Sequence, residues 1–392
     1  MLNMRASSGT QPELVFLYCV NMSAQNHGKR LLILSVGYGK GHHSAAAALS
    51  EYYESIGWQT LITDACAEGY PRCFRLTQVF YDCCVRFLPW LWRVTYDLTD
   101  TADWARLVRL PVLRNIVRSL RSQMDAFKPD LVICTYPLFA YVLDLLRTEG
   151  GCRTPYAVVV TDAREISRPW MCSDARLFVV PDEGSRLSVV NRYALSVDRV
   201  IAAGFPVRRG FRPSFKDDVP SSDKLSVVYG AYRQSRGVER DVDAMFAAFP
   251  QLQLTIIAGH RANLFRKRFR RYEEAGRLTV VQATDNMAEL LASSHFYIGK
   301  AGAATLFECY ACMVPILINY TLPGQEQGNL ELIMEEGVGC HVESTEHLIV
   351  TLHRLLKDDA SGWRSLRGAM KTADRTSVVN RIAMAINQVF GV

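Results

Sequence analysis

The chain has 392 residues and a net charge of +6, with 49% hydrophobic and 21% charged residues. These values exclude a disordered or fibrous chain and favour a soluble protein of two domains. They are compatible with an anionic substrate or membrane surface. The sequence has no run of 18 apolar residues, so we expect no transmembrane helix.

The 11 cysteines are scattered without a disulfide framework, which predicts a reducing compartment. Cys309 and Cys312 form a CxxC on an expected helix, but no second pair or histidine stands at zinc spacing. Core packing is therefore the favoured interpretation, and no metal site is expected. We expect residues 1–29 to be a poorly ordered extension, because the apolar stretch at 14–20 is short for a signal-peptide core.

The first domain opens with a continuous apolar run at 31–36, which predicts a buried strand. A glycine-rich turn follows at 37–44, then an expected helix at 45–56 and a second strand at 60–64. A strand, a glycine turn, a helix and a strand are the usual opening of a doubly wound α/β domain.

The segment from Tyr70 to Phe127 interrupts this alternation, because it is rich first in aromatic residues and then in arginines. One interpretation is a pair of long helices packed on the domain with a solvated basic face, and helical periodicity alone favours it. The other is an amphipathic surface attracted to anionic lipid.

Alternation resumes with strands expected at 131–134, 156–160, 177–180 and 200–202, and a linker at 208–224. A second doubly wound unit has strands expected at 225–230, 252–258 and 278–281 and a helix at 287–292. The chain from 363 to 389 is expected to be helical. No base-reading motif is present, so a nucleic-acid partner is not expected.

The stretch from 296 to 329 carries the clearest candidate site. An expected strand end at 296–298 leads into small residues at 299–305, a helix at 306–312 and a strand at 314–318. A glycine turn at a helix start exposes backbone N–H groups to an anion, and small side chains let a phosphate approach. Glu308 could accept bonds from ribose, and Gln325 and Glu326 follow the next strand. An ordinary βαβ unit with no ligand remains about equally compatible.

Several motifs together resemble one family. They are GYGKGHHSAAAAL at 37–49, Thr161-Asp162 followed by Trp170, GFPVRRGF at 204–211, and KAGAAT, Glu308, PGQE and Asn329 in the second unit. This combination resembles the monogalactosyldiacylglycerol synthase and processive diacylglycerol glucosyltransferase group, inverting enzymes of glycosyltransferase family 28, over about residues 30–390. The resemblance implies a GT-B fold, in which two doubly wound Rossmann-like domains face a cleft.

The resemblance also implies the domain limits. Residues 30–210 would form an acceptor- and membrane-binding domain, and residues 211–362 a nucleotide-sugar-binding domain. Residues 363–392 would form a helical segment, for which a return to the first domain is one expectation.

The resemblance assigns roles to individual residues. His42 falls on a histidine that acts at the acceptor hydroxyl, and Asp162 orients either the acceptor or that base, although a helix N-cap role for Asp162 is almost as compatible. Nucleotide-sugar contacts are implied for one further set of residues: Gly259, Arg261, Gly302, Ala303, Ala304, Thr305, Glu308, Gln325, Glu326 and Asn329.

Two positions depart from the family pattern. A glycine pair after the first strand of the second unit is replaced by Gly230-Ala231, and the glycine pair of KAGG-like stretches is Gly302-Ala303. Both changes fill space near the expected phosphates.

The implied reaction is transfer of galactose or glucose from a UDP-sugar to diacylglycerol, without a metal or other cofactor in the site. A lipid acceptor requires docking on an anionic membrane, so Trp90, Trp92, Arg106 and Arg109 become candidate contacts. The protein would be cytoplasmic and peripheral on the inner face of the cell membrane. Three alternatives stay open: another lipid or polyprenyl-linked acceptor, a sugar-nucleotide 2-epimerase, and a catalytically weak UDP-sugar-binding regulator.

Overall fold

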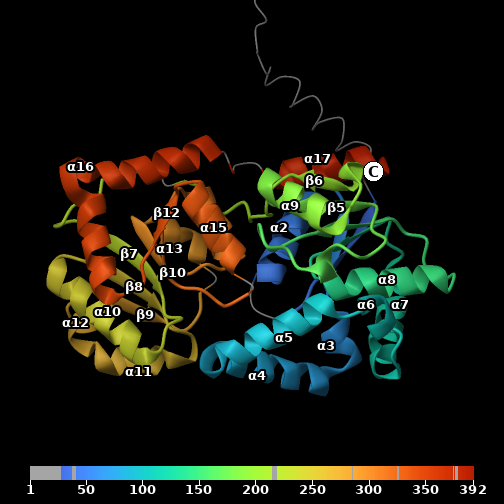
Figure 1. Ribbon diagram of the computed structural model, residues 1–392, viewed down its shortest axis with the longest axis horizontal. Helices are drawn as coiled ribbons and strands as arrows, with labels where there is room; N and C mark the ends of the chain where they lie inside the picture. The colour runs from blue at the N-terminus through green and yellow to red at the C-terminus, as the bar shows by residue number, and fades with distance from the viewer. Residues whose placement is uncertain are drawn as a thin grey trace, which may run out of the picture.

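The computed structural model describes residues 28–37, 41–213, 219–284, 286–324, 326–373, 375 and 378–392. These residues form two lobes that lie side by side, each built on one six-stranded parallel sheet (Figure 1). Of the expected N-terminal extension at 1–29, only Gly28 and Lys29 fall within the described part of the chain.

The first sheet has the strand order β2-β1-β3-β4-β5-β6. Its inner strands come from continuous apolar runs and are buried, as parallel strands covered by helices on both faces require. The order reverses between β1 and β3, where open α/β sheets bind ligands. The strands are β1 (Arg30–Leu34), β2 (Gln59–Thr63), β3 (Leu131–Cys134), β4 (Tyr156–Val159), β5 (Leu177–Val180) and β6 (Val200–Ala202).

Helices cover both faces of this sheet. Side chains of α2 and α17 share a core with one set of alternate strand residues, and side chains of α7 and α8 share a core with the other set. The helices of the first lobe are α2 (Gly41–Ser55), α3 (Ala65–Gly69), α4 (Pro71–Phe87), α5 (Pro89–Thr101), α6 (Trp104–Leu107), η1 (Pro111–Leu113), α7 (Arg114–Phe127), α8 (Pro137–Thr148), η2 (Arg168–Trp170), α9 (Glu183–Tyr193) and η3 (Val197–Arg199).

The second sheet has the strand order β12-β11-β10-β7-β8-β9, and its order reverses between β7 and β10. Its strands are β7 (Ser226–Gly230), β8 (Gln253–Ile257), β9 (Leu278–Val281), β10 (Phe296–Lys300), β11 (Ile316–Tyr320) and β12 (Gly339–His341). Its helices are α10 (Ser235–Ala248), η4 (Gly259–Arg261), α11 (Ala262–Arg268), α12 (Arg270–Glu274), α13 (Met287–Ala292), α14 (Ala303–Cys312), α15 (Gln327–Glu335) and α16 (Thr345–Ala373).

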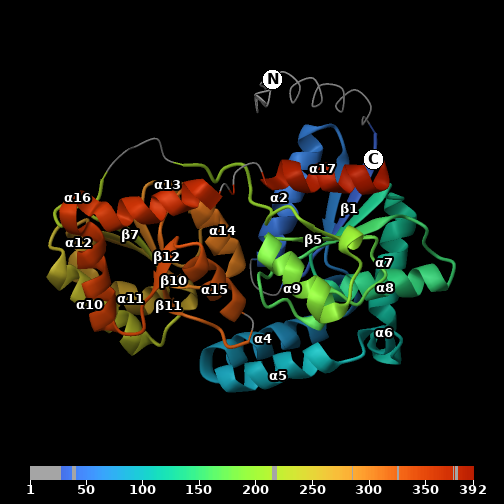
Figure 2. The same ribbon diagram turned by 45° about the horizontal axis from the view of Figure 1, so that its top comes forward.

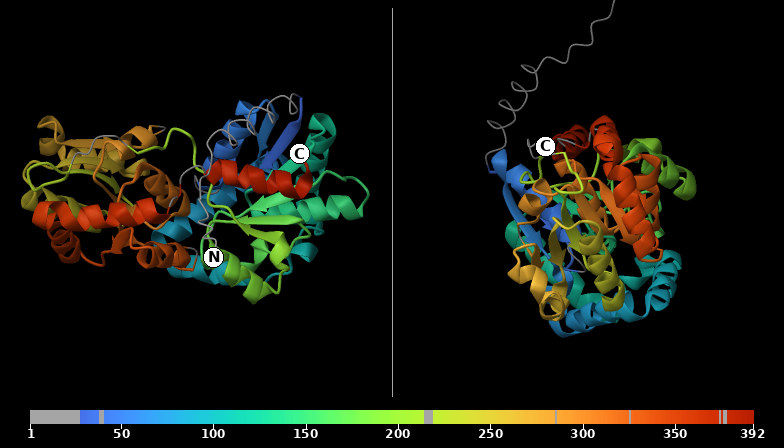
Figure 3. Two further views of the ribbon diagram at one scale, coloured as in Figure 1. Left: turned by 90° about the horizontal axis from the view of Figure 1, so that it is seen from above. Right: turned by 90° about the vertical axis from the view of Figure 1, so that its left-hand side faces the viewer.

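The last helix, α17 (Val378–Phe390), lies on the lobe that holds the first strands (Figures 2 and 3). The sequence placed the end of the second domain at 362, but Trp363 is buried in the second lobe's core and Met370 in the core at the junction of the lobes. The helix α16 is folded back at 357–360, where the backbone is not helical, and this keeps residues up to 373 on the second lobe. Only α17 packs on the first sheet.

Helices α4 and α5 pack against each other as a hairpin along the edge of the molecule, below both lobes in Figure 1. The hairpin belongs to the first lobe in sequence, but it reaches the second lobe. The ring of Tyr96 on α5 lies against Gly324, where an added Cβ atom would be 3.2 Å from the ring. Gly324 also has a φ of +84°, which favours glycine.

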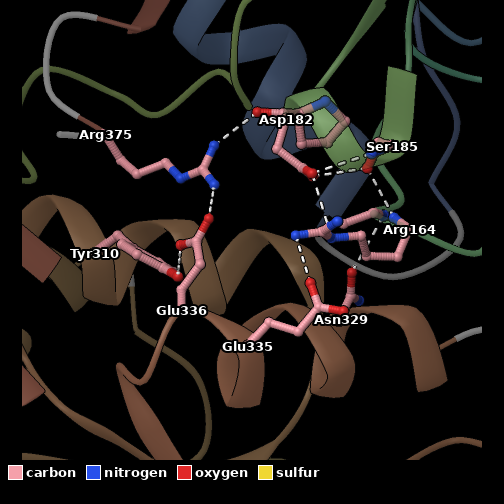
Figure 4. Close-up of polar contacts among 10 residues, drawn as sticks. Arg164, Asp182, Ser185, Tyr310, Asn329, Glu335, Glu336 and Arg375 are labelled. Atoms are coloured by element: carbon pink, nitrogen blue, oxygen red, sulfur yellow. Dashed lines mark hydrogen bonds and ion pairs between the residues drawn. The ribbon is translucent and has the colours of Figure 1, made fainter. Parts of the chain in front are cut away.

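Two arginines join the lobes (Figure 4). Arg164 of the first lobe lies 3.3 Å from Asp182 (Nε to Oδ1) and 2.7 Å from Glu335 on α15 (Nη2 to Oε2). Arg375, between α16 and α17, pairs with Glu336 at the end of α15. We call the contact of Arg164 with Glu335 the interlobe clasp.

Candidate active site

His42 lies on the first turn of α2, directly after the turn that ends β1. Its Nδ1 atom is 2.9 Å from the carbonyl oxygen of Thr135, at the end of β3, and 2.8 Å from the hydroxyl oxygen of Thr161, after β4. The ring also packs edge-on against Tyr136 and near Trp170. The histidine is thus fixed at the point where the strand order of the first sheet reverses.

The partners of His42 define its tautomer. A carbonyl oxygen only accepts hydrogen bonds, so Nδ1 must carry the proton that it donates to Thr135. In the neutral ring the other nitrogen, Nε2, then holds the lone pair. Burial lowers the pKa of His42 to about 4, although the Thr135 carbonyl opposes this shift. At neutral pH the ring is therefore an uncharged proton acceptor.

Asp162 follows β4 and is buried. The indole Nε1 of Trp170 donates to its Oδ2 atom over 2.8 Å. Burial raises the pKa of Asp162 to about 6, and Glu326 adds to the shift, while the Trp170 bond and Lys300 oppose it. The N-cap interpretation of Asp162 is wrong, because the next helical turn begins only at Arg168. Trp170 touches both Asp162 and the His42 ring, so it links the two candidate catalytic groups.

The expected diphosphate turn is the start of α14. Gly302 is the N-cap residue, and Ala303, Ala304 and Thr305 form the first turn. These three residues are half-buried. The N-cap residue is a glycine, so no side chain caps the N–H groups of the first turn. The first N–H groups of a helix have no acceptor within the helix, so this turn presents donors and the positive end of the helix dipole.

Glu308, the expected ribose contact, is buried on α14. Its Oε1 atom accepts a hydrogen bond of 3.0 Å from the hydroxyl of Ser44 on α2. The bond joins residues 264 positions apart. A Cβ atom added to Gly41 on α2 would lie 3.8 Å from the Cβ atom of Ala304 on α14, so the first turns of the two helices lie together. The histidine lobe therefore meets the expected diphosphate turn directly.

The expected sugar-binding pair is described in part, because Gln325 lies outside the described residues. Glu326 is buried, and its Oε1 atom is 2.5 Å from the ammonium of Lys300 at the end of β10. Its Oε2 atom accepts a 3.0 Å bond from the backbone N–H of Leu322.

Asn329 acts as a bridge between the lobes in this structure. Its amide nitrogen donates to the carbonyl of Ala301 over 2.8 Å, and its amide oxygen accepts from the backbone N–H of Ala163 over 3.3 Å. The neighbouring Gly328 allows this approach, because a Cβ atom there would lie 2.3 Å from the Ala163 carbonyl. Both polar ends of Asn329 are engaged by backbone.

Gly259 and Arg261 form a turn after β8. Gly259 has a φ of +57°, and Arg261 donates to the carbonyl oxygens of Ala231 and, over 2.8 Å, of Arg233. These bonds hold the loop after β7, where the sequence departs from the family's glycine pair. The packing of Tyr232 against Gly230 fills this loop.

The four candidate membrane residues are not brought together. Trp90 on α5 is 64% exposed, but Trp92 is half-buried and packs edge-on against Tyr81 of α4. Arg106 and Arg109 are exposed on and just after α6, which follows the C-terminal end of α5 (Figure 1). Only Trp90 of this set belongs to the exposed apolar face of the hairpin.

Four residues in this arrangement had no role in the sequence analysis: Ser44, Thr135, Thr161 and Lys300. Three of them follow or end a strand, which is the usual place for ligand groups in an α/β sheet and the one signal that could have identified them. Their partners lie 26 to 264 residues away in the sequence, so the spacing of neighbouring residues could not predict these pairs.

Comparison with known families agrees with this geometry. The family model for monogalactosyldiacylglycerol (MGDG) synthase matches residues 42–207, and the model for the glycosyltransferase family 28 C-terminal domain matches residues 233–384. A processive diacylglycerol beta-glucosyltransferase of Bacillus cytotoxicus is 25% identical over 348 residues, which are 84% of this chain and 86% of that protein.

Solved structures show the same fold at low identity. MurG of Acinetobacter baumannii has a TM-score of 0.56 at 14% identity, over 92% of this chain and 99% of that one. The UDP-GlcNAc 2-epimerase of Neisseria meningitidis, bound to UDP-GlcNAc, has a TM-score of 0.58 at 12% identity, over 92% and 100%. The fold is therefore GT-B, as the resemblance implied. The first lobe therefore matches the model for monogalactosyldiacylglycerol synthase, and the second lobe matches the model for the C-terminal domain of glycosyltransferase family 28.

Proposed function

We propose that this chain transfers a hexose, glucose or galactose, from a UDP-sugar to the free hydroxyl of diacylglycerol, with inversion at the sugar carbon. The observation that carries the proposal is the meeting of two first turns. One holds His42, whose Nε2 carries the lone pair in the neutral ring, and the other is the start of α14, to which we assign the diphosphate. The match to the monogalactosyldiacylglycerol synthase model and the name of the Bacillus cytotoxicus relative support the lipid acceptor.

The chemistry follows from this placement. The acceptor oxygen attacks the anomeric carbon from the face opposite the diphosphate and forms the new carbon–oxygen bond. The bond from that carbon to the phosphate oxygen breaks, and UDP leaves with its electron pair. The acceptor's proton passes to Nε2 of His42, while Asp162 orients the acceptor or the base through Trp170.

The donor side would stabilise the charge that grows on UDP. Backbone N–H groups of Ala303, Ala304 and Thr305 and the dipole of α14 point at the leaving diphosphate. Glu308 would exchange its bond to Ser44 for the ribose hydroxyls, and Glu326 would contact the hexose. Because these groups supply donors and positive potential, the proposal requires no cofactor in the site.

The test is sugar transfer from UDP-glucose and UDP-galactose to diacylglycerol in anionic vesicles. His42→Ala is expected to lower kcat by about 100-fold or more, as loss of a general base does. The exposed neighbour His43 provides the matched control, and His43→Ala should retain activity.

Each other result favours a different function. Transfer that survives His42→Ala would exclude this base. Interconversion of the UDP-sugar without an acceptor would identify an epimerase. UDP-sugar binding without transfer to diacylglycerol, or to any other lipid or polyprenyl-linked acceptor, would identify a regulator, which the filled loop at Tyr232 favours.

We also infer that the α4–α5 hairpin docks on an anionic membrane. Among the described side chains of this hairpin, seven large apolar ones are exposed: Leu76, Val79, Phe80, Leu88, Trp90, Val94 and Leu98. Exposed Arg72, Arg75 and Arg93 accompany them and would attract anionic lipid. No helix in the described part of the chain is long and apolar enough to span a bilayer.

We call this set of seven the apolar stripe. Tyr96, on the same hairpin, packs against Gly324, which lies two residues before the expected sugar contact Glu326. A lipid acceptor that binds at the hairpin would therefore be close to the candidate site. UDP-sugars are cytoplasmic metabolites, and we therefore place the protein on the inner face of the cell membrane.

A further inference from the structure

Lys300 is the first residue of the KAGAAT motif, but neither the sequence analysis nor the proposed chemistry assigns it a role. It ends β10, beside the point where the strand order of the second sheet reverses, and its side chain is only 25% exposed. A lysine is rarely kept in such a place unless its charge is paired.

The ammonium of Lys300 is fixed on two sides. Its Nζ atom donates to Oε1 of Glu326 over 2.5 Å and lies 5.3 Å from the centre of the Tyr232 ring. The other oxygen of Glu326 is held by the N–H of Leu322. The two carboxylate oxygens thus have one fixed orientation, with lone pairs left to accept further hydrogen bonds.

The backbone leaves room for this ammonium. A Cβ atom on Gly302 would lie 3.1 Å from Cε and 3.2 Å from Nζ of Lys300, and 3.5 Å from Oε1 of Glu326. Gly302 has an ordinary extended backbone, so its glycine is explained by space and not by conformation. The pair of Lys300 and Glu326 therefore lies against the N-cap of α14.

The positive charge of Lys300 also affects the two nearby carboxyl groups, Glu326 and Asp162. Burial is the largest single effect and lowers the pKa of Lys300, but Glu326, Tyr232 and Tyr81 of α4 together outweigh it and raise the pKa above its ordinary value. Glu326 raises the pKa of Asp162, and Lys300 opposes that effect. Removing Lys300 would leave two buried carboxyl groups facing each other across the lobes.

We propose that Lys300 is a positioning residue for recognition of the donor sugar, which acts by holding Glu326 in the orientation that accepts the hexose hydroxyls. The inference rests on the proposed function, because it takes Glu326 as a sugar contact. It makes a specific claim: Lys300 serves the hexose and not the UDP part of the donor.

The experiment compares binding of UDP and UDP-glucose (or UDP-galactose, if that is the donor) by calorimetry, for wild type, Lys300→Met and Lys300→Arg. In Lys300→Met we expect UDP-hexose to bind about 10- to 100-fold more weakly, as loss of one member of a buried charge pair does, with UDP binding unchanged within about twofold. Lys300→Arg keeps the charge and should recover part of the loss. Arg268→Met removes ion pairs with Asp243 and Glu239 in the same lobe and should change neither affinity.

Two further results complete the test. Glu326→Gln should match the loss of Lys300→Met, and the double variant should lose no more than either alone, because both act on one contact. The double variant also removes the unpaired carboxylate, so it tests the claim if Lys300→Met fails to fold. Retained UDP binding demonstrates that a variant is folded.

The inference is overturned if Lys300→Met binds UDP-hexose normally. It is also overturned if UDP and UDP-hexose lose affinity equally in a folded variant, because the ammonium would then act on the diphosphate. Failure of the wild type to bind any UDP-hexose is a different result, and it would remove the proposed function itself.

Discussion

The uncharged forms of both His42 and Asp162 are favoured in this structure. For the histidine this lowers the pKa, and for the aspartate it raises the pKa. The pKa of His42 falls to about 4, so the ring is neutral above that value, and the pKa of Asp162 rises to about 6, so the acid is protonated below that value. Burial is the main cause for both, because it penalises charge of either sign. A neutral histidine beside an ionised aspartate requires a pH above about 6.

This difference predicts the pH dependence of transfer. We expect kcat/KM to fall below about pH 6, where Asp162 becomes protonated, while His42 remains neutral. Trp170→Phe removes the N–H donor that lowers the pKa of Asp162, so the acid limb should move to higher pH. Asp162→Asn should lack this limb and have a plateau about 100-fold lower. Coincident limbs in wild type and Trp170→Phe would contradict the assignment.

The α4–α5 hairpin is the element whose role the structure changes most. Sequence periodicity favoured two packed helices, and α4 and α5 are indeed long helices, but one face of the pair remains uncovered. The exposed positions recur at helical spacing, with Trp90, Val94 and Leu98 on one side of α5. The arginines of α6 and the inward-facing Trp92 are not part of this face.

The apolar stripe makes a prediction about membrane binding. The triple change Leu76→Ser, Trp90→Ser and Leu98→Ser should weaken binding to anionic vesicles by more than about tenfold, because each such side chain contributes ~1 kcal/mol or more when it enters lipid. Transfer to diacylglycerol in vesicles should fall with it. Binding of UDP should not change.

The matched control replaces Leu187 and Val350 with serine. Both are at least half exposed but lie outside the hairpin, on α9 and α16. If the control and the triple variant lose vesicle binding equally, or if neither does, the hairpin is not the docking surface. Sedimentation with vesicles of defined anionic content measures each case.

At the scale of the whole molecule, hydrogen bonds and ion pairs hold the two lobes in contact. The Ser44–Glu308 bond and the Asn329 bridge involve candidate-site residues, and the interlobe clasp adds an ion pair between Arg164 and Glu335 on α15. Arg164 has a φ of +60°, an uncommon conformation for arginine, and this backbone is held where the side chain reaches Glu335. Under the proposed function, a donor whose ribose binds Glu308 would displace the Ser44–Glu308 bond.

The clasp predicts how easily the lobes separate. Arg164→Ala removes the contacts with Asp182 and Glu335, and a partly exposed ion pair contributes ~1 kcal/mol or less. We expect backbone hydrogen exchange at 163–165 and 327–335 to become up to about fivefold faster. Arg93→Ala breaks a pair within α5 and should leave exchange at these segments unchanged. Equal exchange in Arg164→Ala and wild type would show that the clasp does not hold the lobes.

Local pattern was sufficient for the elements. Apolar runs predicted β3, β5, β6 and β9 with their observed bounds, and the helix at 287–292 was also confirmed. The strand β12 and the helix α15 were missed, because each is short: three residues are too few for a periodic signal, and the nine residues of α15 directly follow the PGQE turn. The candidate site was predicted as a set of residues, but not as a set of contacts.

By itself, the sequence determined the two doubly wound units, the order of their motifs and the residue types at the two switch points. Tertiary structure alone decided that His42 donates to the Thr135 carbonyl, that Ser44 donates to the Glu308 carboxylate, and that Lys300 pairs with Glu326. The physical reason is that helix and strand formation depend on neighbours a few residues away, so the local sequence pattern predicts them. Hydrogen bonds, burial and pKa shifts depend on groups that approach only when distant segments fold together.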